Sequence, residues 1–127
     1  MAATANFERV VRGVAAAHDC GVDLEMKAGY SVVHNDAAFV EFVAGVTGDV
    51  LGEGRFFELP SPIMGAEDFG YVLQKVPGTM MFLGGTPEGA DLAAAAPNHS
   101  PRVMFDEAAM ATGIATYTAV ALDALSP

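Results

Sequence analysis

The hydrophobic positions at the start of the chain recur with the spacing of an α-helix. Apolar side chains fall three or four positions apart, and charged residues occupy the other faces. Asn6 is expected to cap this helix, and Gly21 to end it after about residue 19. The predicted apolar stripe comprises Phe7, Val10, Val11, Val14 and Ala17.

From residue 22 to residue 32 the pattern changes to alternation with a period of two. Apolar residues stand at every second position, separated by Asp, Glu, Lys, Gly and Ser. This alternation predicts one long strand with a wet face and a dry face. A helix followed by a one-sided strand forms half of an α+β unit, which needs further elements to cover it.

A second helix is predicted over residues 37–47, with an apolar stripe of Phe39, Val40, Val43 and Val46. Asn35 and Asp36 end the preceding strand, and either side chain suits the capping position. The composition changes here, so residues 34–36 are the predicted crossing between two domains. These domains would comprise residues 1–34 and 35–127.

The rest of the chain alternates between short strands and helices. Residues 55–59 are expected to form a short strand, and residues 67–76 a short helix. Residues 79–85 are continuously apolar and bounded by glycine, which is typical of a strand buried on both faces. Asp106 is expected to cap a final helix over 107–125. The broad apolar face predicted for this helix comprises Met110, Gly113, Ile114, Tyr117, Val120, Ala121 and Leu125. The pattern therefore indicates an α/β fold class.

Composition and charge narrow the functions that such a chain can have. Apolar residues make up 52% of it and charged residues 17%, which predicts a folded chain rather than a disordered one. A net charge of −10 would repel nucleic-acid phosphates and disfavours anionic membrane surfaces, so neither partner is expected. Cys20 is the single cysteine, and the N-terminus lacks signal-peptide features, so a cytoplasmic location is the expectation.

Three histidines are candidates for chemistry. His18 falls at the end of the first helix, where a cation is favourable, and His34 lies at the domain crossing, so structural roles are preferred for both. His99 stands in a long connection that bears glycine and proline, and functional groups concentrate in such loops. Spacing alone leaves open whether His99 binds a metal.

Glu67 and Asp68 form a second candidate site at the start of a predicted helix. Acidic residues there are favoured by the helix dipole, which is a purely structural explanation. Alternatively, Gly65 permits close approach of the backbone to a ligand, and a carboxylate points into a cleft. From spacing alone, the structural explanation is preferred.

Two segments taken together carry a family resemblance. "MGAEDFGYVLQKVPGTMMFLGG" (64–85) and the segment that begins "NHSPRVMFDEAAM" (98–110) resemble the C-terminal end of the two-metal amidohydrolases. These enzymes are related to aminoacylase and zinc carboxypeptidase, and the similar branch contains hippurate hydrolase and indole-acetyl-amino-acid hydrolases. The positions that fit in order are Gly65, Glu67, Asp68, Phe69, Val76, Pro77, Gly78, His99, Ser100, Pro101, Asp106 and Glu107.

The resemblance implies a role for several residues. It makes His99 a metal ligand, with Asn98 and Ser100 beside it as supporting residues, and it places Gly65, Glu67 and Asp68 at the substrate. In the family, two divalent metals, zinc or manganese, occupy each active site. The other metal ligands and the glutamate general base lie upstream in the family, so no catalytic residue is assigned here.

The resemblance also implies an architecture and an activity. The chain would comprise the end of an α+β lid or dimerisation domain followed by the C-terminal part of an α/β catalytic domain. The intact enzyme would hydrolyse amide bonds in N-acyl amino acids or related small amides, and would form a homo-oligomer through the lid. The alternative is a non-catalytic fragment, or a dimerisation or binding module, without activity alone.

Overall fold

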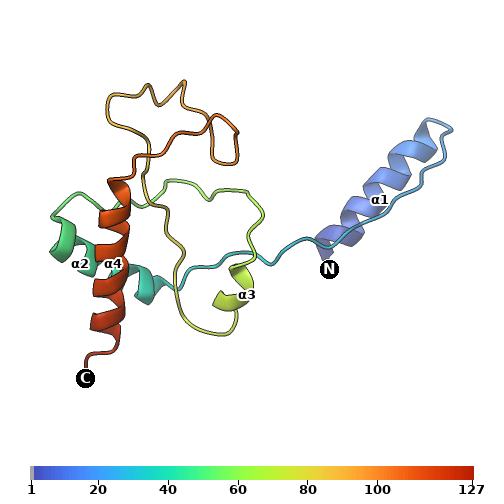
Figure 1. Ribbon diagram of the computed structural model, residues 1–127. Helices are drawn as coiled ribbons and strands as arrows, with labels where there is room; N and C mark the ends of the chain where they lie inside the picture. Colours follow the sequence, from blue (N-terminus) through green and yellow to red (C-terminus); the bar gives the residue numbers. More distant parts are fainter. Residues whose placement is uncertain (1) are drawn as a thin grey trace. The chain divides into compact units, whose positions relative to one another are not determined.

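The computed structural model describes residues 2–127, which divide into two compact units (Figure 1). The first unit ends at Tyr30, and the second comprises Ser31–Pro127. The sequence pattern placed the domain crossing slightly later, at residues 34–36. Contacts described below explain the difference, since they tie the segment that starts at Ser31 to the second unit.

The first unit contains helix α1 (Ala2–Ala17). The predicted helix is present, but Asn6 lies inside it and does not cap it. Alanine-rich sequence before Asn6 favours an earlier start. Asp19, not Gly21, turns the chain at the other end: it has a φ of 54°, and its N–H donates to the carbonyl of Ala16. His18 follows the helix directly and is exposed.

The apolar stripe of α1 is not covered within its own unit. Phe7, Val10 and Val14 lie along one face of the helix, and each is about half exposed. On another face Glu8 and Arg12 form an ion pair of 2.8 Å across one helical turn. An exposed pair of this kind contributes only a few tenths of a kcal/mol, roughly 0.3–0.5. The helix therefore lacks the packing that normally stabilises an amphipathic face.

The strands predicted over 22–32, 55–59 and 79–85 are not formed in residues 2–127, where all the regular elements are helices. This part of the prediction was wrong for a physical reason. A strand is stable only when its backbone N–H and C=O groups pair with a neighbouring strand, whereas a helix satisfies its own. Alternation of side chains can therefore mark a segment as strand-like without supplying the strand it must pair with.

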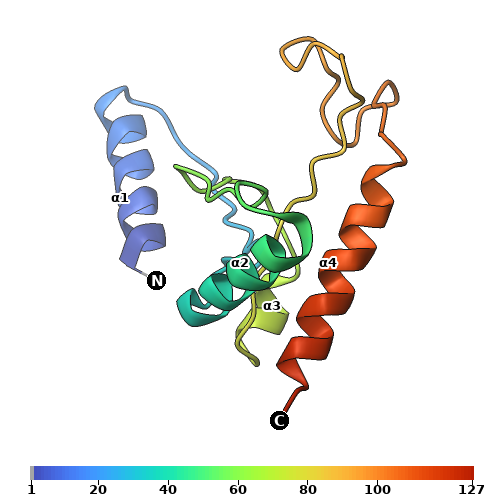
Figure 2. The ribbon, with the colours of Figure 1, turned by 90° about the vertical axis from the view of Figure 1, so that its left-hand side faces the viewer.

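The core of the second unit lies between α2 (Ala37–Leu51) and α4 (Ala109–Ala124), which lie side by side in both ribbon views (Figures 1 and 2). Val43 is 1% exposed and Val46 is 5% exposed, so both are excluded from water. They come from the stripe that the sequence predicted for this helix. Thr116 of α4 is also buried.

The start of α2 agrees with the sequence prediction. Asp36 is the N-cap residue, and its Oδ1 accepts a hydrogen bond of 2.8 Å from the backbone N–H of Phe39. The helix continues beyond the predicted end at residue 47 to Leu51, and Gly52 closes it with a φ of 90°. A positive φ is readily adopted by glycine, so Gly52 sets the end of the helix.

The start of α4 is two residues later than predicted. The N-cap position is Ala108, which makes no side-chain capping bond, but Oδ1 of Asp106 accepts from the N–H of Ala108 at 2.9 Å. Asp106 therefore caps a turn that leads into the helix. Further along, Gly113 leaves room for Leu83: a Cβ added at Gly113 would lie 2.9 Å from Cδ2 of Leu83.

The apolar side chains of α4 are divided between two faces. The face toward the core carries small residues, Gly113, Thr116 and Ala119 among them, which are buried or half-buried. The large side chains recur three to five positions apart on exposed surface, and we call this set the outer stripe. Its members are Met110 (59% exposed), Ile114 (67%), Tyr117 (80%), Leu122 (63%) and Leu125 (83%).

Helix α3 (Gly70–Leu73) is shorter than the predicted helix over 67–76. Turns at 68–69 and 74–75 flank it, so the predicted region bends continuously but forms only one helical turn of α type. Gly70 is buried against the backbone of Ser31 and Val32. The side chains of Gln74 and Ser31 also form a hydrogen bond. These contacts attach the start of the second unit to α3.

Candidate functional site

His99 lies in a tight turn of the connection between residues 86 and 106. The N–H of Ser100 donates to the carbonyl of Pro97 at 3.1 Å, which closes the turn around Asn98 and His99. His99 has a φ of 69°, in the left-handed region that few non-glycine residues adopt. Its side chain is exposed. An imidazole on an exposed, unusual turn is accessible to a ligand.

The two neighbours of His99 make different contacts. Oδ1 of Asn98 accepts a hydrogen bond of 3.1 Å from the backbone N–H of His99. Oγ of Ser100 instead accepts from the N–H of Arg102 at 3.2 Å, within the turn that follows. Asn98 therefore contacts the histidine residue itself, whereas Ser100 shapes the chain beyond it.

Glu67 and Asp68, the second candidate pair, have distinct surroundings. Glu67 is half-buried, and its Oε1 accepts a hydrogen bond of 3.0 Å from the N–H of Phe69. The side chain of Asp68 is exposed, and its carbonyl accepts from the N–H of Tyr71 at 3.0 Å at the start of α3. The carboxylate of Glu67 is thus engaged in the turn, and the carboxylate of Asp68 faces solvent.

Gly65 precedes this pair in an exposed segment. A Cβ added at Gly65 would meet only Cγ2 of Ile63, at 3.9 Å, so no close approach inside residues 2–127 requires a glycine there. The family resemblance implies that Gly65 lies at the substrate, where a glycine would permit close approach of a ligand. That role would have to involve a group other than the neighbouring side chains described here.

The described residues contain no cluster of three or more His, Cys, Asp or Glu side chains that could hold a metal ion. A stable zinc site needs three or four such donors at short range. His99 nevertheless fits the role of a single ligand, because its imidazole is exposed on a turn whose backbone is hydrogen-bonded on both sides. By themselves, the described residues therefore do not form a closed metal site.

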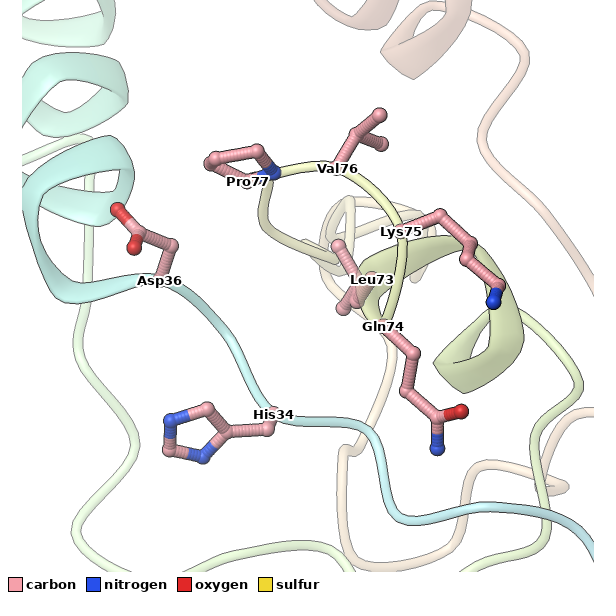
Figure 3. Close-up of a pocket in the computed structure, with 7 residues that line it drawn as sticks. All are labelled: His34, Asp36, Leu73, Gln74, Lys75, Val76 and Pro77. Atoms are coloured by element: carbon pink, nitrogen blue, oxygen red, sulfur yellow. The ribbon is translucent and has the colours of Figure 1, made fainter.

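A pocket of about 260 Å³ lies beside the start of α2, lined by His34, Asp36, Leu73, Gln74, Lys75, Val76 and Pro77 (Figure 3). The ring of His34 and the amine of Lys75 point in different directions and do not converge on one position. The Asp36 carboxylate is already engaged by the helix cap. The polar groups are therefore not arranged to bind one ligand together, and the structural role assigned to His34 stays a prediction.

A second pocket, of about 360 Å³, lies at the start of α4. Its walls are mainly apolar and include Leu83, Phe105 and Met110. None of the site residues predicted from the sequence lines either pocket. Neither of these two pockets therefore gathers the predicted site residues.

Sequence reasoning interpreted Asn35 only as the end of a strand or a helix cap. In the structure its Oδ1 accepts a hydrogen bond from the backbone N–H of Met80, 45 positions away. No local pattern carries a signal for such a long-range contact, because the donor belongs to a segment with its own, unrelated periodicity.

Most of the chain matches one protein-family model. Residues 5–123 match the model described as "Peptidase family M20/M25/M40". The chain belongs to this family. The resemblance to amidohydrolases of the aminoacylase and carboxypeptidase type is thereby confirmed.

The chain is similar to several curated members of the M20 family. It is 39% identical over 77 residues to an N-acetyldiaminopimelate deacetylase of Lactiplantibacillus plantarum, covering 59% of this chain and 19% of the relative. It is 34% identical over 110 residues to the probable hydrolase sll0100 of Synechocystis, covering 87% and 28%. It is 30% identical over 119 residues to the IAA-amino acid hydrolase ILR1-like 4 of Arabidopsis thaliana, covering 91% and 26%.

The chain thus spans about a quarter of the length of these relatives. No solved structure matches it. In the part of the chain that the structure describes, no helix is both long and apolar enough to cross a membrane.

Proposed function

We propose that the chain contributes to a metal-dependent amidohydrolase that acts on N-acyl amino acids or related small amides. The observation that carries this proposal is the family match over residues 5–123. Two relatives are named as a deacetylase of N-acetyldiaminopimelate and a hydrolase of IAA-amino acids, and both names describe cleavage of an amide. Because the chain spans about a quarter of these relatives, the activity is assigned to an intact protein that supplies the remaining site residues.

In this proposal the two structural units belong to different domains of the intact enzyme. The first unit corresponds to the end of an α+β lid or dimerisation domain, and the second to the C-terminal part of an α/β catalytic domain. The division of the chain at Tyr30–Ser31 supports two domains.

His99 is the proposed metal ligand. A neutral imidazole is a common donor to zinc and manganese, and the exposed ring of His99 is accessible to such an ion. The two divalent metals would supply Lewis-acid polarisation of the amide carbonyl and an activated water. In this proposal the further ligands and the general base are assigned to residues outside this chain, as the family resemblance implies.

The segment Gly65–Asp68 is the proposed substrate-side loop. Because Glu67 is hydrogen-bonded within its own turn, we assign it to shaping the loop. The exposed Asp68 carboxylate is the group available to contact a substrate or to orient the amine portion of that substrate. Gly65, which is free of close neighbours among the described residues, would give the substrate access to the backbone.

The exposed apolar surface supports assembly with further protein. We assign the outer stripe of α4 to packing within the catalytic domain. The stripe of α1 is assigned to contacts within the lid and its homo-oligomer, because both stripes are too apolar to remain exposed in a stable protein.

The test is amide hydrolysis by the intact protein after reconstitution with zinc or with manganese. N-acetyl amino acids and aromatic acyl amino acids are the substrates to compare. His99→Ala should lower both metal content and turnover by at least about tenfold, since even changes to groups around a ligand cost 10–100-fold. His18→Ala is the matched control, because His18 is an exposed histidine at the end of α1.

Two results would contradict the proposal. Metal content that is unchanged in His99→Ala would remove the residue from the metal site. Absence of amide hydrolysis by a metal-loaded intact protein, across the acyl groups tested, would favour the non-catalytic alternative of a binding or dimerisation module.

A further inference from the structure

We draw no further inference here: the strongest candidate, the apolar pocket at the start of α4 walled by Leu83, Phe105 and Met110, shares Met110 with the exposed outer stripe of that helix, and nothing in the described residues, 2–127, shows what covers it.

Discussion

Oδ1 of Asn35 accepts a hydrogen bond of 2.9 Å from the backbone N–H of Met80. Next to it, the N–H of Asp36 donates to the carbonyl of Gly78, also at 2.9 Å. These two bonds tie the chain just before α2 to the chain just after α3. Together with the contact between Gly70 and Ser31, they show why the second unit begins at Ser31 and not at residues 34–36.

Asp36 contributes to stability through its cap on α2. Asp36→Ala should lower the free energy of unfolding by about 1 kcal/mol, because the N–H of Phe39 loses its partner. Asp36→Ser should retain most of the stability, since serine caps helices comparably. Urea denaturation followed by circular dichroism measures both. Equal stability of the alanine and parent proteins would contradict the assigned role of the cap.

Gly70 is required by close packing. A Cβ at this position would lie 2.8 Å from the carbonyl oxygen of Ser31 and 3.0 Å from that of Val32. Gly70→Ala should therefore destabilise the protein by about 1–3 kcal/mol, even though alanine is the better helix former. Gly45→Ala in α2 is the matched control: its Cβ meets nothing within 4 Å, so it should stabilise by about 0.5–1 kcal/mol. Thermal unfolding of the two variants should shift in opposite directions.

Thr47 presents a buried hydroxyl whose oxygen has no hydrogen-bond partner among the described residues. The residue is 4% exposed, so its side chain is almost completely removed from solvent. Thr47→Val exchanges the hydroxyl for a methyl group of similar size and should stabilise by about 1 kcal/mol. Thr47→Ser keeps the hydroxyl, loses the methyl group and should destabilise. A chemical denaturation series that ranks serine above valine would overturn this explanation.

The outer stripe of α4 should bind a hydrophobic dye in the isolated 127-residue chain. Ile114 and Tyr117 are 67% and 80% exposed, so replacing both with glutamine removes apolar surface without touching the core. Dye fluorescence should fall, and the helical circular dichroism signal should remain. Thr118→Gln, an exposed change on the same helix, should leave dye binding unaltered. Dye binding that is unchanged in the double variant would place the exposed apolar surface elsewhere.

Helices and their caps were predictable to the extent that they depend on nearby residues. The stripe containing Val43 and the cap at Asp36 were both confirmed, because a helix closes its hydrogen bonds within four residues. The predicted face of α4 was only partly correct. Periodicity placed Gly113, Ile114 and Tyr117 on one broad apolar face, but the packing of α2 selected the small residues and left the large ones exposed.

The candidate site shows the same division. The sequence singled out His99 and its neighbours. The M20 family match confirmed the resemblance from which their proposed roles follow. The left-handed φ of His99 and the different contacts of Asn98 and Ser100 could not be predicted from the sequence. Conformation at a single turn depends on which local hydrogen bonds form, and several arrangements are compatible with one short sequence.

By itself, the amino-acid sequence determined the apolar stripe of α2 and the cap at Asp36, because each depends on residue types at short spacing. The family followed from an ordered set of motifs along the chain, and the resemblance made His99 the candidate ligand. Tertiary structure alone decided where the two units divide, which face of α4 is buried and that residues 79–85 form no strand. The physical reason is that pairing and burial are properties of two segments together. The residues of one segment do not specify which other segment it will pair with or pack against.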